Sequence, residues 1–142
     1  MTNNSTKTPH EIEIEVQSAD IDELGHVNNV VYLRWVQEAA TSHWHVLATD
    51  EQKQALLWVV RKHEIEYRRA ALKGDAIVAR TWVGEASGRT FERHTEILRK
   101  ADGKLLAKAR TLWTPVDVET GRSAHPGPDV YGLFSTSGKG TV

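Results

Sequence analysis

One long amphipathic helix is the sequence feature that most limits the possible fold of this chain. From Val30 onward, apolar and small side chains recur at helical spacing on one face, and polar side chains recur on the other. The first face comprises Tyr32, Val36, Ala39, Ala40, His43 and Leu47, and the second comprises Arg34, Glu38, Thr41 and His45. This pattern predicts a helix from about Asn29 to about Ala48.

Strand patterns flank this helix on both sides. Residues 11–17 alternate strictly between polar and apolar side chains, as in a strand with one buried face. Residues from Leu57 to about Pro115 contain four further strands, separated by turn sequences at 73–75, 87–88 and 102–103. One polar face on each strand predicts an antiparallel sheet. The fold class is therefore α+β, with one helix covering one face of a five-stranded sheet.

Chain length and chain ends suggest a single domain. A chain of 142 residues can bury one core but not two independent ones. A short helix is expected after Pro126, because Pro128 suits a first helical turn. We expect a folded domain over residues 10–134, with disordered tails at 1–9 and 135–142.

Composition excludes several classes of function. A formal net charge of -1, with basic residues spread along the chain, argues against nucleic-acid binding. Apolar runs of about 18 residues do not occur, so no membrane span is expected. Cysteine is absent, which rules out a disulfide framework, a thiolate zinc site and a cysteine nucleophile. These features suit a cytoplasmic protein.

The segment before the helix has the makeup of a reaction site. Residues 20–29 contain carboxylates, an imidazole and two amides, in the order Asp-Ile-Asp-Glu-Leu-Gly-His-Val-Asn-Asn. Asp, Gly and Asn in succession predict a loop, and the Asn pair suits a helix N-cap. Free N–H groups at a helix start can stabilise an oxyanion, and Asp22 and His26 would lie beside it. This arrangement suits acyl transfer without a metal or an organic cofactor.

Two nearby histidines do not predict a metal site. His43 and His45 are two residues apart, so on a helix they face different directions and cannot share one ion. Exposed sheet edges and a partly uncovered helix face, in contrast, are features that a second copy of the chain would cover. We expect a homodimer or a dimer of dimers.

The loop and the helix together resemble the hotdog-fold thioesterases. The resemblance covers roughly residues 10–134, and a second matching segment is Ile65-Glu66-Tyr67-Arg68-Arg69. Its main motif is Asp20-x-Asp22-x-x-Gly25-His26-Val27-Asn28-Asn29-x-x-Tyr32, followed by Glu38-Ala39-Ala40. The resemblance implies one hotdog domain, in which a five-stranded antiparallel sheet wraps around one long central helix.

The resemblance also implies roles for individual residues. In the 4-hydroxybenzoyl-CoA thioesterase branch, the second aspartate is the catalytic carboxylate, which corresponds to Asp22. In the same branch a backbone N–H at the helix start polarises the thioester oxygen, which corresponds to Asn29. A histidine implicated in catalysis in the acyl-ACP thioesterase branch corresponds to His26. The expected substrate-binding residues are Gly25, Val27, Asn28, Arg68 and Arg89.

Hydrolysis of an acyl-CoA thioester, within fatty acid metabolism, is the function that these residues favour. Asp22 would either attack the carbonyl or deprotonate water. His26 would orient Asp22 or the water, protonate the departing thiolate, or only shape the loop.

Three alternatives remain open at this point. An acyl-ACP thioesterase is disfavoured, because Leu24 and Ala70 stand where the plant enzymes have an asparagine and an acidic residue. A hotdog enoyl-CoA hydratase is disfavoured, because its Asp and His are five residues apart, whereas Asp22 and His26 are four apart. The third alternative is a non-catalytic module that binds acyl-CoA.

Overall fold

The computed structural model describes residues 9–134, so the two expected tails fall almost entirely outside it. The elements are β1 (His10–Glu15), a 3₁₀ turn (Ser18–Asp20), α1 (Asn29–Leu47), α2 (Asp50–Ala55), β2 (Leu56–Tyr67), β3 (Ala76–Ser87), β4 (Thr90–Arg99), β5 (Leu105–Asp117) and α3 (Pro128–Phe134). Five strands and one long helix confirm the predicted α+β class, and α3 begins at the predicted proline.

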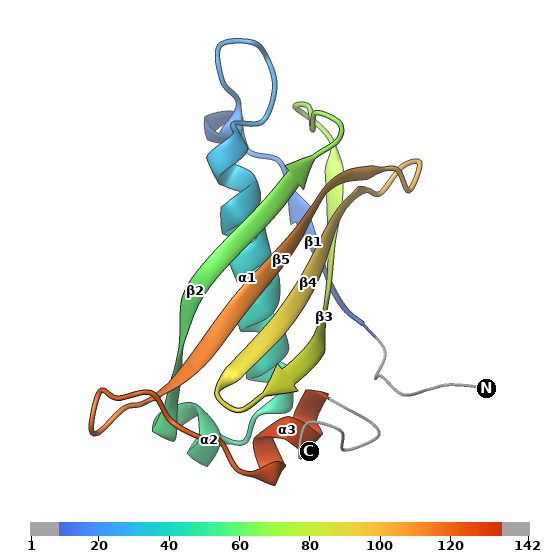
Figure 1. The fold of residues 1–142 in the computed structure, drawn as a ribbon. Helices are drawn as coiled ribbons and strands as arrows, with labels where there is room; N and C mark the ends of the chain where they lie inside the picture. Colours follow the sequence, from blue (N-terminus) through green and yellow to red (C-terminus); the bar gives the residue numbers. More distant parts are fainter. Residues whose placement is uncertain (1–8, 135–142) are drawn as a thin grey trace, which may run out of the picture.

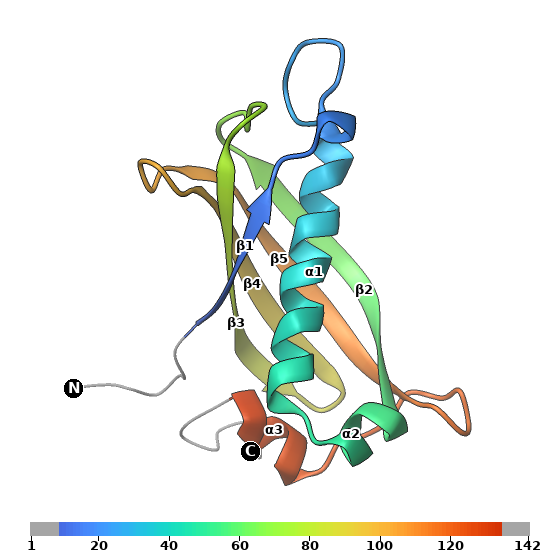
Figure 2. The ribbon, with the colours of Figure 1, turned by 180° about the vertical axis from the view of Figure 1, so that it is seen from behind.

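The sheet curves around α1. Its strand order is β1-β3-β4-β5-β2, and every neighbouring pair is antiparallel. Strand β2 follows the helix in sequence but pairs with β5, at the far edge from β1 (Figure 1). The helix lies across one face of the sheet, and α2 and α3 gather at the end where α1 finishes (Figure 2). This arrangement leaves the start of α1 at the opposite end of the molecule.

Helix α1 follows its predicted pattern closely. It starts at Asn29 and ends at Leu47, one residue before the predicted end, because the extended backbone of Ala48 stops it there. Its buried residues are Val31, Tyr32, Trp35, Val36, Ala39, Ala40, His43 and Trp44. The buried face is thus wider than predicted and includes Trp35, whose side chain is fully enclosed. A sheet that curves around the helix covers more of it than a flat sheet would.

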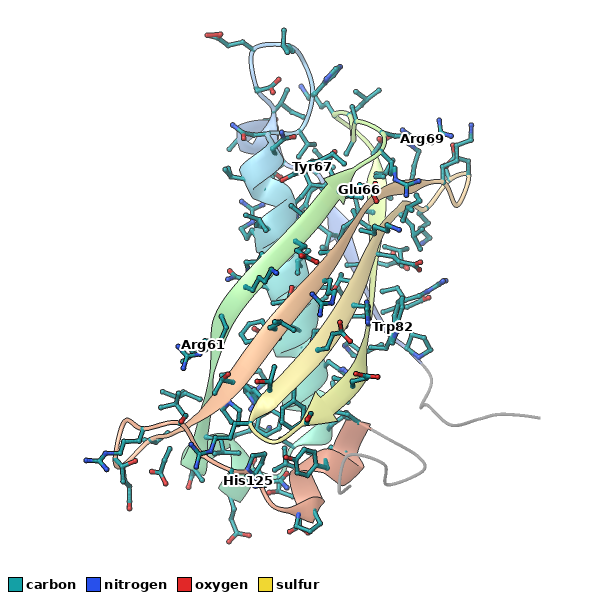
Figure 3. All side chains as sticks on the ribbon, in the orientation of Figure 1. Arg61, Glu66, Tyr67, Arg69, Trp82 and His125 are labelled. Carbon is teal, nitrogen blue, oxygen red and sulfur yellow. The ribbon has the colours of Figure 1, made fainter. Side chains whose placement is uncertain are left out.

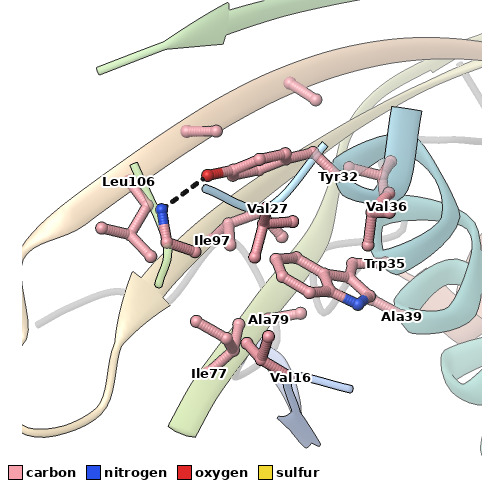
Figure 4. Packing of buried hydrophobic residues seen from close by; sticks show 14 residues of the cluster. Val16, Val27, Tyr32, Trp35, Val36, Ala39, Ile77, Ala79, Ile97 and Leu106 are labelled. Atoms are coloured by element: carbon pink, nitrogen blue, oxygen red, sulfur yellow. Dashed lines mark hydrogen bonds between the residues drawn. The ribbon is translucent and has the colours of Figure 1, made fainter. Parts of the chain in front are cut away.

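Two apolar clusters lie along the helix. The first surrounds the first half of α1 and is built around Tyr32, Trp35 and Val36 (Figure 4). The second surrounds the last turns of α1 and includes Trp44 together with Phe134 of α3. Burial of such large side chains contributes roughly 1.5–3 kcal/mol each. Helix and sheet are therefore held together at both ends of α1.

Three features differ from the predictions. Strand β1 covers residues 10–15 instead of 11–17, because the chain turns at Val16 into the 3₁₀ segment. Helix α2 was not predicted. On β4, the inward side chains are Phe91, Arg93, Thr95 and Ile97, so the buried face of this strand carries a charged residue. Among residues 9–134, every helix is too short or too polar to cross a membrane.

Candidate active site

The loop between the 3₁₀ turn and α1 closes on itself. The Asp22 N–H donates to the His26 carbonyl at 2.8 Å, and Ile21 and Val27 form an isolated bridge next to this pair. Gly25 lies at the turn with a φ of 80°, a left-handed conformation that side chains disfavour. Loop and helix start are thereby held together at the end of the molecule away from α2 and α3 (Figure 1).

One oxygen of Asp22 organises this loop. Its Oδ1 accepts hydrogen bonds from the backbone N–H groups of Leu24, at 2.9 Å, and of His26, at 3.2 Å. Its Oδ2 accepts no hydrogen bond from a described residue. The side chain is half-buried, so this second oxygen can still reach water or a substrate. Asp22 therefore combines the loop-capping role with a free carboxylate oxygen.

The first N–H of the helix is also free. Asn28 is the N-cap, and its side chain accepts a hydrogen bond from the Val30 N–H at 3.2 Å. The next N–H, that of Asn29, donates to no other described residue. A helix start with an unpaired N–H carries partial positive charge, which suits a carbonyl oxygen that is gaining negative charge.

An open groove of about 400 Å³ brings the loop and the helix start together with the end of β2. Its lining residues are Asp22, Leu24, His26, Val27, Asn28, Asn29, Tyr32, Tyr67, Arg68, Arg69 and Ala70. Figure 3 shows Tyr67 and Arg69 at this end of the sheet. Six of the eight predicted site residues line the groove, and Gly25 lies in the same loop.

The remaining predicted residue, Arg89, is not brought to this groove. It lies in the turn between β3 and β4, where its guanidinium donates to the Ser123 hydroxyl at 3.3 Å. Lys100, which follows β4, also lies away from the groove and pairs with Glu13 of β1 at 3.0 Å. Within residues 9–134, the cations that line the groove are Arg68 and Arg69.

Two tyrosines connect the helix to the strand and were not predicted as site residues. The Tyr67 hydroxyl donates to the Asn29 carbonyl at 3.2 Å, and the Tyr32 hydroxyl accepts from the Ala71 N–H at 2.8 Å (Figure 4). Burial raises the pKa of both phenols, so both are neutral at physiological pH. Tyr32 stands in the loop motif and Tyr67 in the matching strand segment, so both carried a sequence signal.

The two histidines of α1 are separated as expected. His43 is buried and His45 is exposed, so their rings lie on different sides of the helix. The His26 ring is exposed and makes no hydrogen bond to a described residue. Its free ring nitrogens are therefore available to solvent or substrate at the mouth of the groove.

Comparison with known proteins identifies the family of the chain. A family model described as the thioesterase-like superfamily matches residues 16–134. A Bacillus subtilis protein named putative acyl-CoA thioesterase YneP is 30% identical over 111 residues, which are 76% of this chain and 80% of that protein. A chloroplastic acyl-[acyl-carrier-protein] hydrolase of Cuphea viscosissima is 34% identical over 70 residues, which are 49% of this chain. The chain spans only 17% of that plant protein.

A solved structure shares the fold. A thioesterase of Thermus thermophilus complexed with coenzyme A and Zn superposes with a TM-score of 0.78 at 23% identity, covering 90% of this chain and 98% of that one. The family match and the fold agree, and the chain belongs to the thioesterase-like superfamily, with a hotdog fold.

Proposed function

We propose that this protein hydrolyses acyl-CoA thioesters at the groove beside the start of α1. The observation that carries the proposal is the position of the unpaired Asn29 N–H in the same groove as the free Oδ2 of Asp22. The thioester carbonyl oxygen binds the Asn29 N–H, and the reaction places negative charge on that oxygen. Asp22 then acts on the carbonyl carbon.

Asp22 has two chemical routes. As a nucleophile, its carboxylate adds to the carbonyl and expels the coenzyme A thiolate, which leaves an anhydride that water then hydrolyses. As a general base, it takes a proton from a water molecule that attacks the carbonyl directly. Both routes release one free acid and one thiol. The thiolate, with an ordinary pKa near 8.5, leaves without needing a strong acid, so His26 acts mainly by orienting the reacting groups.

Coenzyme A is the favoured carrier. The relative YneP, matched over most of its length, is named a putative acyl-CoA thioesterase. Arg68 and Arg69 line the groove and supply positive charge for the phosphates of coenzyme A, and Arg68 also pairs with Glu66 at 3.1 Å. Val27 and Asn28 line the groove next to the helix start, and Gly25, in its left-handed conformation, lets the loop turn beside it.

A second copy of the chain completes the protein in this proposal. Strand β2 is an edge of the sheet, and its residues Leu57 and Val59 are exposed, as are Val30 and Val46 on α1. An edge strand with apolar side chains favours pairing with another chain. We therefore propose a homodimer through β2, with the groove open toward the partner.

Release of free thiol from acyl-CoA tests the proposal. Short, medium, long and aromatic acyl-CoAs are assayed with the wild-type protein, the Asp22→Asn variant and the Glu23→Gln variant. Asp22→Asn keeps an oxygen for the two loop hydrogen bonds but lacks the reactive carboxylate, so we expect a loss of kcat of about 100-fold or more. Glu23→Gln removes a neighbouring exposed carboxylate and should leave the rate unchanged.

Two outcomes would overturn the assignment. Full activity of Asp22→Asn would show that this carboxylate does not act in the reaction. Absence of thiol release from every acyl-CoA, with hydration of an enoyl-CoA or with tight binding alone, would favour the hydratase or the binding module. Faster release from acyl-ACP than from the matching acyl-CoA would favour a carrier protein as the substrate carrier, as in the Cuphea relative.

A further inference from the structure

A second cavity lies at the other end of α1, about 22 Å along the helix axis from Asn29 to Trp44. Its volume is about 280 Å³, slightly below the usual range of small-ligand sites, which is about 300–1,000 Å³. Five aromatic side chains line it, those of Trp44, Trp58, Phe91, Trp113 and Phe134. The cavity and the groove beside Asp22 share no residue within one chain.

A buried cation lies in the wall of this cavity. Arg93 is only 5% exposed, and burial lowers its pKa to about 10, which still leaves it protonated at neutral pH. Its NH1 donates to the Nδ1 of His43 and to the hydroxyl of Thr81, both at 3.0 Å. Both acceptors are neutral, and no carboxylate of a described residue pairs with this guanidinium. Buried charges are normally paired, so the positive charge of Arg93 calls for a counter-charge.

Two tryptophans that line this cavity have an indole N–H without an acceptor. The indole Nε1 atoms of Trp58 and Trp113 are buried and make no hydrogen bond. Native structures leave few buried donors unpaired, and each such case calls for an explanation. Two of the three unpaired indole groups of the described residues belong to this one cavity.

The mouth of the cavity has the same electrostatic character. Lys53 and His45 also line the cavity; Lys53 pairs with Asp50 at 3.8 Å, and none of the lining residues is an aspartate or a glutamate. The lining therefore includes the cation Arg93 and no anion, and flat apolar rings surround it. A ligand that matches must bring an anionic acceptor on a flat apolar body.

We propose that this cavity binds a small organic carboxylate with an aromatic body, the carboxylate facing Arg93 and the indole N–H groups of Trp58 and Trp113. The carboxylate supplies the missing counter-charge, and charge-assisted hydrogen bonds of this kind are about twice as strong as neutral ones. Such a group can come from a free acid or from the far end of an acyl group held by a neighbouring subunit. The chemistry of recognition is the same in both cases.

Calorimetric titration of the wild-type protein with 2-naphthoate and with neutral 2-naphthamide tests the proposal without any substitution. We expect the acid to bind about tenfold tighter or more. In ¹H–¹⁵N spectra, the acid should shift the indole signals of Trp58 and Trp113, assigned with the Trp58→Phe and Trp113→Phe variants. Each of these variants keeps a ring but lacks the donor, and should weaken binding of the acid but not of the amide. Trp82→Phe, on the outer face of the sheet (Figure 3), is the matched control.

Equal affinity for acid and amide, or shifts of other indole signals only, would overturn the proposal. Binding by the Asp22→Asn variant should equal that of the wild type, so a failure here is distinguishable from a failure of the proposed reaction. Thiol-release kinetics separate the two sources of the carboxylate. If 2-naphthoate competes with acyl-CoA, the cavity binds the far end of the acyl group. If 2-naphthoate inhibits without competing, or does not inhibit, the cavity binds a free acid.

Discussion

Arg34 on α1 donates to the buried carboxylate of Asp20, with 2.9 Å between its NH2 and Oδ1. The other oxygen of Asp20 accepts the Gln17 N–H at 2.8 Å, and the Asp20 carbonyl accepts the Asn28 N–H. Asp20 thus fixes the chain on both sides of the loop, whereas Asp22 keeps an oxygen free. Both oxygens of Asp20 are therefore used in structural contacts, whereas one oxygen of Asp22 is not. We accordingly make opposite predictions for the variants of these two aspartates.

Replacing Asp20 with alanine should destabilise the protein without removing a reactive group. The change removes a buried carboxylate and leaves the Gln17 N–H without its acceptor and Arg34 without its partner, so we expect a loss of about 2 kcal/mol in the free energy of unfolding. Urea denaturation measures this loss. Asp22→Asn is the control and should change stability by less than about 0.5 kcal/mol. A stable Asp20→Ala variant would contradict the anchoring role.

The two tyrosines of the site should differ in their effect on stability. Tyr32→Phe leaves the buried Ala71 N–H unpaired, which costs about 1–3 kcal/mol. Tyr67→Phe removes a hydrogen bond at the exposed Asn29 carbonyl, which water can replace, so its cost should be below about 1 kcal/mol. Thermal and urea unfolding of both variants would test this order, and equal losses would contradict it.

His26 should matter for turnover and not for stability. Its ring makes no hydrogen bond to a described residue, so His26→Ala should leave the free energy of unfolding unchanged within about 0.5 kcal/mol. If the ring orients the reacting groups, kcat should fall about tenfold or more while KM changes little. Steady-state thiol release measures both constants. An unchanged kcat would restrict His26 to shaping the loop.

Local patterns predicted most of the elements, because each pattern reflects burial of one face. Each of these signals involves only a few neighbouring residues. They are the alternation in β1, the helical spacing of α1, and turn glycines such as Gly74 and Gly103, which adopt positive φ. Helix α2 lacks an apolar face, since all of its residues but Ala55 are polar, and only the capping box between Thr49 and Gln52 marked it.

Contacts between distant segments could not be predicted in this way. Pairing of β2 with β5 depends on how the sheet closes around the helix, which strand patterns alone do not specify. Burial of Arg93 depends on His43, 50 residues earlier in the chain, and a charged residue in a strand is normally expected to face water. The loop segment 20–29, in contrast, is only ten residues long, which is why most of the groove was predicted from it.

Buried His43 should make the stability of the protein depend on pH. Burial, the charge of Arg93 and the neighbouring His10 lower the pKa of His43 from 6.5 to about 3 in the folded protein. Between these two values the unfolded chain binds a proton that the folded protein excludes, so stability is greatest above pH 6.5 and falls as the pH is lowered toward 3. The pKa of His10, stacked on His43, is lowered by burial too and acts in the same direction.

His43→Asn isolates this contribution, because its amide oxygen can still accept the hydrogen bond from Arg93. Urea unfolding at pH 7.5 and at pH 5 gives the change in the free energy of unfolding between the two pH values for each protein. When the change for the variant is subtracted from that for the wild type, the contributions of the other titrating groups cancel. One proton corresponds to at most about 1.4 kcal/mol per pH unit. The free energy of unfolding of the wild type should therefore fall by up to about 2 kcal/mol more than that of the variant over the titrating range. Solvent screening of the ring reduces this value. Equal losses would show that His43 is protonated in the folded protein, which is incompatible with Nδ1 accepting from a guanidinium that can only donate.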